Sequence, residues 1–373
     1  GIRNLSILGR AVEYVEINQD ISVNLDKIPL DDKKTYALLA RGETMGVFQL
    51  GGSGMTKWLM ELKPKVITDL SAMVALYRPG PMGSIPDYID RAQHPEKIKF
   101  FDPRMKDYMQ QSLGLLVYQE DVLLTAINIA GYSWLEADTF RKAMGKKIPA
   151  EMAKQKDKFI SGAVEHGMEQ KKADQLWALI EPFAAYGFPK AHAASYAIIA
   201  YQTAYMKANF PVEFMAAVMT AEYGDIDKIA EAIEECKKLG IVVLPPDVNK
   251  SKVGFTIEDL QNLSPEDIER ALNDKSNKSL TQGIRFGLSA IKNVGVLAIE
   301  SIIKAREEGV FTSLVELCSR VDNRLVNKKT LESLIKAGAL DSFGGRAPQL
   351  LILDQVLEET HKRSKSKISG QVS

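Results

Sequence analysis

The stretch Tyr186–Pro211, YGFPKAHAASYAIIAYQTAYMKANFP, predicts one long aromatic helix around which the rest of the chain is organised. Gly187 permits a sharp turn into this helix, and Pro189 fits its first position because the proline ring presets a helical φ. Lys190 and His192 then lie in the first turn, where the helix dipole disfavours cations. Such an arrangement is tolerated when an anion binds at the helix N-terminus. The stretch therefore predicts one wall of an anion site.

A second cationic segment, Phe140–Lys147 (FRKAMGKK), lies upstream and predicts the other wall of the same site. It carries four cations within seven residues: Arg141, Lys142, Lys146 and Lys147. Gly145 suits the C′ position that ends a helix, so Arg141 and Lys142 fall in a last helical turn. A triphosphate needs several such groups at once. Arginine offers it a planar fork, and lysine offers a mobile charge.

Each feature also has a plain structural interpretation. Cations at an isolated helix C-terminus are usually solvated, and a single histidine is usually a hydrogen-bonded structural residue. The density of cations favours a site, because repulsion between them accumulates unless an anion is present. Tyr196 lies four residues after His192 on the same helical face, where it is placed to stack on a base.

The composition is that of an ordinary globular protein of two or three domains. The chain has 373 residues, of which 45% are apolar and 26% charged, and a formal net charge of +0. Global charge therefore gives no argument for nucleic-acid binding. Two distant cysteines without a CxxC partner exclude a thiolate zinc site and a disulfide framework, as expected in a reducing cytoplasm. No apolar run reaches the length of a membrane span.

Most of the chain reads as helix interrupted by glycine and proline, so the fold class is mainly α with few short strands. Asp31 is the expected N-cap of an early helix, and 241–246 is the expected strand. The charged stretch 259–281 reads as a mobile insertion, and the Lys- and Ser-rich end from Thr360 reads as disordered. Asp225-Ile-Asp227 resembles a metal-binding carboxylate pair, but it reads better as a helix cap. No metal cluster and no Ser/His/Asp arrangement stands out.

Two helical hairpins are expected near the C-terminus. In the first, two apolar helices flank Asn293-Val-Gly295, where the tight connection requires a positive φ. The second helix would point its N–H groups at a DNA backbone, with contacts from Lys292, Asn293 and Gly295. A weaker second unit spans 325–346. A plain αα-hairpin is the rival interpretation, and it is stronger for the second unit.

Seven ordered motifs resemble the bacterial DNA polymerase III alpha subunit family, the C-family replicative polymerases. They are GVFQL…SGM (46–55), ALYRPGPM (75–82), VYQEDV (117–122), FRKAMGKK (140–147), the stretch 186–220, VLPPDVN (243–249) and FGLSAIKNVG (286–295). The resemblance implies a multi-helix fingers domain followed by a tandem helix-hairpin-helix module. It covers roughly residues 21–350.

The resemblance also implies a function and its residues. It implies template-directed DNA synthesis with two Mg²⁺ ions, whose palm carboxylates would lie before Gly1, so that the isolated segment is inactive. It places Arg141 and Lys142 on the incoming triphosphate, and Lys190 and His192 become reasonable additional contacts. Lys142 stands where the family usually has a second arginine, which loses the bidentate geometry.

The implied partners are dNTPs, primer-template DNA, and the sliding clamp and other replisome subunits through the full-length cytoplasmic protein. Contacts with DNA are expected from Arg78 and Lys147 in addition to the first hairpin. The expected domains are the palm end (1–25), fingers (26–222), an acidic connector (223–283), the helix-hairpin-helix module (284–348), and a helical end with a disordered tail (349–373). Two alternatives remain, a non-catalytic helix-hairpin-helix DNA-binding module and an error-prone paralogue.

Overall fold

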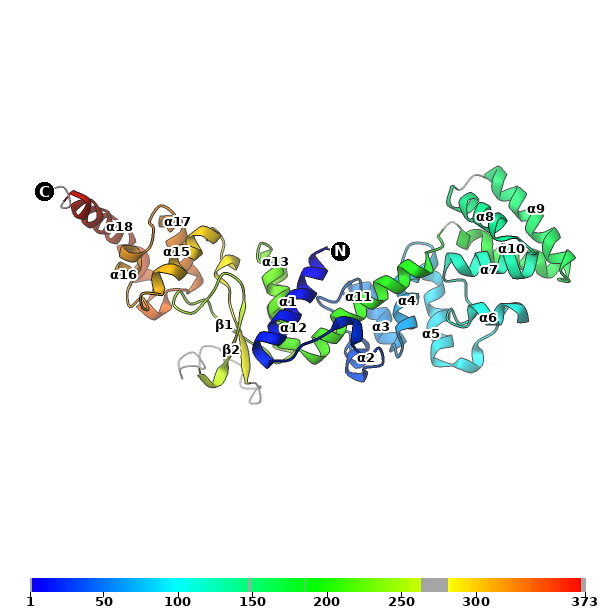
Figure 1. Ribbon diagram of the computed structural model, residues 1–373, viewed down its shortest axis with the longest axis horizontal. Helices are drawn as coiled ribbons and strands as arrows, with labels where there is room; N and C mark the ends of the chain where they lie inside the picture. Colours follow the sequence, from blue (N-terminus) through cyan, green and yellow to red (C-terminus); the bar gives the residue numbers. More distant parts are fainter. Residues whose placement is uncertain (1, 147–148, 185, 263–280, 370–373) are drawn as a thin grey trace. The chain divides into compact units, whose positions relative to one another are not determined.

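The computed structural model describes residues 2–146, 149–184, 186–262 and 281–369, and it confirms a mainly α fold. The chain divides into two compact units (Figure 1). One unit is Asn24–Asn209, and the other joins Gly1–Val23 to Phe210–Ser373. The domain limits given above stay predictions.

The first half of the Asn24–Asn209 unit is built on the helix that the opening stretch predicted. This helix, α11 (Lys190–Asn209), packs on α4 (Ile67–Leu76) and α2 (Lys33–Ala40), and α3 (Ser53–Leu62) and α5 (Ile85–Gln93) complete the layer. Buried alanines recur along α11 at a spacing of three to four residues, so α4 can approach its backbone closely. They are Ala193, Ala197, Ala200 and Ala204.

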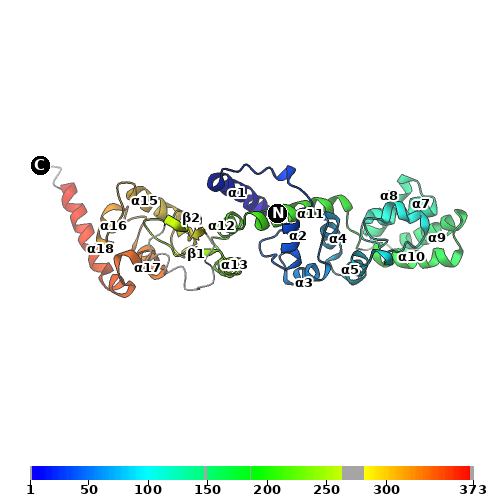
Figure 2. The ribbon, with the colours of Figure 1, turned by 90° about the horizontal axis from the view of Figure 1, so that it is seen from below.

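The second half of this unit is a separate apolar cluster formed by α7 (Gln119–Ala130), α8 (Trp134–Lys146), α9 (Pro149–Glu165) and α10 (Gln170–Ala184). These four helices gather together in both views (Figures 1 and 2). Phe140 stacks on Trp177 with ring centroids 5.7 Å apart, and Phe159 packs on the same ring at 5.6 Å. The short helix α6 (Lys106–Met109) adds Met109 to the cluster.

In the other unit, α1 (Ile2–Gln19) packs on α12 (Pro211–Ala221), which is followed by α13 (Ile226–Lys238). A small sheet has the order β1-β3-β2, with β1 (Val242–Leu244) parallel and β2 (Thr256–Asp259) antiparallel to β3 (Gln282–Arg285). The predicted strand at 241–246 is thus confirmed as β1. A separate core holds α15 (Val296–Arg306), α16 (Leu314–Arg320), α17 (Lys328–Ala337) and α18 (Arg346–Ser369).

Several local predictions need correction. The N-cap of α2 is Asp32, whose carboxylate accepts the Thr35 N–H at 2.9 Å, and not Asp31. Helix α11 begins at Lys190, so Pro189 precedes the first helical position. The tail prediction was wrong as far as Ser369, because α18 continues to that residue.

Two further predictions have different outcomes. Most of the expected mobile insertion, residues 263–280, lies outside the described part of the chain. The prediction that Asp225 caps a helix is confirmed, because its carboxylate accepts the Lys228 N–H at 3.2 Å at the start of α13. No described helix is both long enough and apolar enough to span a membrane.

Candidate functional site

The segment that leads into α11 is held by the first turn of α7. Phe188 forms a parallel bridge with Tyr118, and its carbonyl accepts the Gln119 N–H at 3.0 Å. The Gln119 side chain donates to the Gly187 carbonyl, also at 3.0 Å. A Cβ on Gly187 would lie 2.8 Å from Gln119 Cγ, and this close approach is the reason for glycine here, because its φ is not positive.

The N-terminus of α11 has one anionic partner within the chain, and the binding of a further anion there stays a prediction. The Lys190 N–H donates to Glu120 Oε2 at 2.8 Å, across a separation of 70 residues. This carboxylate satisfies a free N–H of the first turn and complements the helix dipole. Sequence reasoning missed Glu120, because no local spacing connects it to α11.

Arg78 and Gly80 also contact the segment that leads into α11. Arg78 Nη2 donates to the Tyr186 carbonyl at 2.6 Å, and its guanidinium lies over the Phe188 ring at 4.4 Å. Burial lowers the pKa of Arg78. Gly80 has a φ of +101°, and a Cβ there would lie 2.9 Å from the Tyr186 ring. Arg78, predicted as a DNA contact, therefore holds the turn into α11.

The side chains of the first turns of α11 form an aromatic row. The His192 ring lies 5.2 Å from Phe188 and 4.2 Å from Tyr196, which in turn lies 5.2 Å from Phe48. His192 is exposed and Tyr196 half-buried. The prediction that His192 and Tyr196 share a helical face is confirmed.

Lys190 is half-buried beside a carboxyl group that is strongly shielded from water. Its Nζ lies over the Tyr118 ring at 5.6 Å. The neighbouring Asp121 accepts the backbone N–H groups of Val117 and Tyr118 at 2.9 Å each, which caps α7. Burial raises the pKa of Asp121 to about 6, although these two hydrogen bonds and the charge of Lys190 act in the opposite direction.

In the FRKAMGKK segment, two cations share one carboxylate. Arg141 Nη2 lies 2.8 Å from Asp138 Oδ1, and Lys142 Nζ lies 2.7 Å from Asp138 Oδ2. Hydrogen bonds from Lys142 and Arg141 hold the pKa of Asp138 below its usual range. This pairing offsets part of the repulsion on which the sequence argument relied. Its spacing of three and four residues was visible in the sequence.

Helix α8 ends one residue after the predicted position, and the predicted C′ role of Gly145 was wrong. Gly145 lies inside α8, which continues to Lys146, and its φ is not in the left-handed region. The side chain of Lys146 and the whole of Lys147 lie outside the described part of the structure.

Helix α7 is the element that both cationic segments share. It packs against α8, which carries Arg141 and Lys142, and its first turn holds the start of α11. Phe140 and Met144 of α8 lie in one apolar cluster with Val122 of α7. The two segments are therefore tied to the same helix, and their joint contact with one anion remains a prediction.

The first C-terminal hairpin has a tighter form than predicted. Its first arm is only a 3₁₀ turn, Leu288–Ala290, before α15. The positive φ of +66° belongs to Asn293, whereas Gly295 is an extended N-cap with φ −77°. Lys292, Asn293 and Gly295 form an exposed tip, and a Cβ on Gly295 would meet nothing within 4 Å.

The second hairpin joins α17 to α18. Gly338 caps α17 with a φ of +84°, and a Cβ there would lie 2.3 Å from Arg346 Nη2. Arg346 pairs with Asp341 at 2.7 Å across the turn. The exposed tip of the first hairpin packs on α17, because Asn293 Nδ2 donates to Ser333 Oγ at 3.3 Å.

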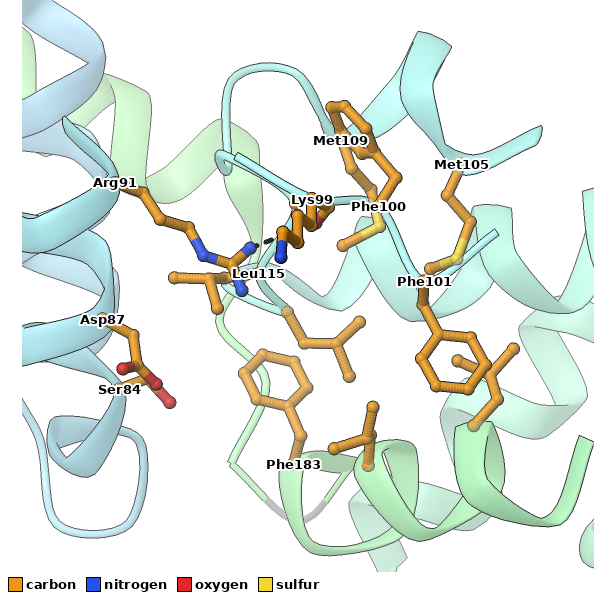
Figure 3. Close-up of a pocket in the computed structure, with 14 residues that line it drawn as sticks. Ser84, Asp87, Arg91, Lys99, Phe100, Phe101, Met105, Met109, Leu115 and Phe183 are labelled. Atoms are coloured by element: carbon orange, nitrogen blue, oxygen red, sulfur yellow. Dashed lines mark hydrogen bonds between the residues drawn. The ribbon is translucent and has the colours of Figure 1, made fainter. Parts of the chain in front are cut away.

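A cavity of about 420 Å³ lies elsewhere in the Asn24–Asn209 unit, and its walls are largely apolar (Figure 3). Phe100, Phe101 and Phe183 are among its lining residues, and so is Arg91, which belongs to α5. Arg91 Nη1 donates to the Leu113 carbonyl at 2.8 Å, so this cation holds the backbone. None of the predicted nucleotide contacts whose side chains the structure describes lines this cavity.

Comparisons with known proteins match two segments of the chain to family models. Residues 4–167 match the model of the bacterial DNA polymerase III alpha subunit finger domain, and residues 240–350 match a helix-hairpin-helix motif. The matches define the class of protein, a mainly α fingers region followed by a helix-hairpin-helix module. No group of three or more His, Cys, Asp or Glu side chains that could hold a metal occurs in the part of the chain that the structure describes.

Similar full-length proteins fix the family. The DNA polymerase III subunit alpha of Thermus aquaticus is 44% identical over 379 residues, which cover 99% of this chain and 29% of that protein. The subunit alpha of Halalkalibacterium halodurans is 41% identical over 96% of this chain, and that of Mycobacterium tuberculosis is 40% identical over 100% of it. The chain belongs to the family of bacterial DNA polymerase III alpha subunits and spans less than a third of these relatives.

Proposed function

We propose that this chain is the fingers and helix-hairpin-helix part of the catalytic alpha subunit of a bacterial replicative DNA polymerase. In this role it contacts the triphosphate of the incoming dNTP and guides primer-template DNA. The similarity of nearly the whole chain to named alpha subunits supports this assignment.

The clamped segment 186–189 is the observation that carries the nucleotide-binding role. Arg78, Gln119 and Glu120 fix its course, so the side chains that follow it start from a rigid position. Such preorganisation lets Lys190 and His192 meet a triphosphate without first being ordered. The exposed His192 ring and the half-buried Tyr196 ring offer an aromatic surface beside Lys190.

Arg141 and Lys142 are proposed to meet the same triphosphate. Their pairing with Asp138 is exposed and therefore weak, because water screens the charges, so a polyphosphate can displace the carboxylate. The guanidinium of Arg141 provides the planar fork. Lys142 adds a point charge.

The two Mg²⁺ ions of the reaction are proposed to be held by palm residues outside this chain, as the family resemblance implies. Primer-template DNA is proposed to meet the exposed tip of the first hairpin. The sliding clamp and other replisome subunits would act through the rest of the alpha subunit.

Replacement of Arg141 by alanine in the full-length alpha subunit tests the nucleotide role. We expect KM for dNTPs to rise about tenfold or more, as loss of one charged hydrogen bond of 1.5–3 kcal/mol implies, while duplex DNA affinity is unchanged. Lys154→Ala is the matched control, since Lys154 is an exposed helical cation paired with Glu151 at 3.2 Å.

The opposite pattern would reject the proposed role of Arg141. If Arg141→Ala weakens duplex binding and leaves KM for dNTPs unchanged, the cationic segment belongs to the DNA path. If the two variants behave alike in both assays, Arg141 is a solvated surface residue.

A further inference from the structure

A cavity of about 400 Å³ lies where α1 meets the beginning of the first hairpin, within one compact unit. Arg10 and Tyr14 of α1 line it on one side, and Ser289 and Val296 of the hairpin line it on another. Tyr223, just after α12, completes the rim. These side chains take no part in the sites described above.

The back wall of this cavity is fixed by hydrogen bonds. Tyr14 donates its hydroxyl proton to the Phe255 carbonyl at 2.9 Å, and the Phe255 N–H donates to Thr220 Oγ1 at 3.1 Å. Gly254 closes the wall, because a Cβ there would lie 2.8 Å from Thr220 Cγ2. These contacts hold the back wall of the cavity in place.

The polar side chains on the rim are all able to donate hydrogen bonds. Arg10 is half-buried and pairs with no carboxylate within the described chain, and neither the Tyr223 nor the Ser289 hydroxyl has a described partner. None of the described lining residues is acidic. A cation and hydroxyl donors facing one space without an acidic partner suit an anion with several oxygens, and arginine suits phosphate best.

We propose that this cavity binds a phosphate of the DNA backbone, with Arg10 as the principal contact. The inference rests on the proposed DNA-guiding role of the hairpin. Val296, the first residue of α15, lines the cavity and directly follows the exposed tip, so the two surfaces are continuous. Arginine, serine and tyrosine are among the usual phosphate contacts in protein–DNA complexes.

The test is the salt dependence of primer-template binding by the full-length alpha subunit. One phosphate contact changes the slope of log K against log [salt] by about 0.9, which is about eightfold in affinity near 0.1 M salt. We expect Arg10→Ala to show this loss and Arg10→Lys to retain most of the slope. Arg3→Ala is the matched control, because Arg3 lies on the same helix and is paired with Glu222 at 2.8 Å.

The inference is overturned if Arg10→Ala and Arg3→Ala bind DNA with the same slope as the unaltered subunit. In that case Lys292→Ala separates the proposed DNA contact of the hairpin from that of the cavity. A reduced slope for Lys292→Ala leaves the hairpin on DNA and rejects only the cavity, whereas an unchanged slope rejects both. A higher KM for dNTPs in Arg10→Ala, with unchanged DNA binding, would assign the cavity to a free nucleotide and also overturn the proposal.

Discussion

Replacement of Arg78 separates a structural role from a role in DNA binding. The sequence predicts a DNA contact, but in the structure Nε donates to the Ala75 carbonyl at 3.1 Å, Nη2 donates to the Tyr186 carbonyl at 2.6 Å, and the guanidinium covers Phe188. A lysine keeps the positive charge but cannot reach both carbonyls, because it lacks the planar fork.

The expected loss of folding free energy follows from these contacts. Hydrogen bonds from a charged group contribute about 1.5–3 kcal/mol each when buried, and an exposed cation–π contact about 0.5–1 kcal/mol. The Tyr186 contact is exposed and Arg78 is half-buried, so we discount the sum. We expect a loss of about 1–2 kcal/mol for Arg78→Lys and about 2–3 kcal/mol for Arg78→Ala.

Hydrogen exchange in the full-length alpha subunit measures this loss where it occurs. Exchange should speed up in the peptides covering 77–82 and 186–193 for both variants, while α15 serves as an internal reference. Lys57→Ala, which removes an exposed cation of α3, is the charge control. The slope of DNA binding against salt should be unchanged in all three variants.

The opposite result would refute the structural role. If Arg78→Ala lowers the salt slope by about one contact while Arg78→Lys and the exchange rates match the unaltered protein, Arg78 is a phosphate contact. The position of the 186–189 segment would then not depend on Arg78.

Further predictions concern the helices that carry the site. Glu120→Gln keeps an acceptor for the first N–H of α11 but removes the charge at the helix N-terminus. Urea unfolding should therefore show a free energy of unfolding lower by about 0.3–1 kcal/mol, and this difference should shrink at high salt. Because the folded-state pKa of Asp121 is raised from 3.8 to about 6, its favourable contribution is fully present below pH 3.8 and is lost as the pH rises through 6. The free energy of unfolding of the unaltered protein, relative to Asp121→Asn, should therefore fall by on the order of 3 kcal/mol between pH 4 and 7, and a constant difference would contradict the burial argument. Gly162→Ala should cost about 1–3 kcal/mol in the same assay, because its Cβ would lie 2.2 Å from the Ala130 carbonyl oxygen, whereas Gly145→Ala, in open space within α8, should be neutral or stabilising.

Much of the fold could be predicted because its signals are local. The position of α11, the cap at Asp225 and the strand at 242–244 follow from residues within one or two turns of each other. The same local reasoning erred where a glycine has more than one use. The sequence predicts that Gly145 ends a helix with a left-handed backbone. In the structure it lies within α8, and its φ is not in the left-handed region.

The candidate site could be predicted only in part. The basic residues at 141, 142, 190 and 192 are visible in the sequence, and so is the i, i+3 and i, i+4 spacing from Asp138 that explains the pairing of the first two. The carboxylate that accepts the first N–H of α11 could not be found in this way. Glu120 reaches Lys190 only because α7 and the 186–189 segment lie side by side in the folded unit.

By itself, the sequence determined the helical fold class, the family resemblance and the unusual concentration of cations at a helix start. These depend on residue type and spacing along the chain. Only the tertiary structure showed that Glu120 accepts the first N–H of α11, that Arg78 donates to the Tyr186 carbonyl, and that Arg10 lines a cavity beside the hairpin. The physical reason is that each of these depends on distances between elements far apart in the chain, and side-chain spacing carries no information about such distances.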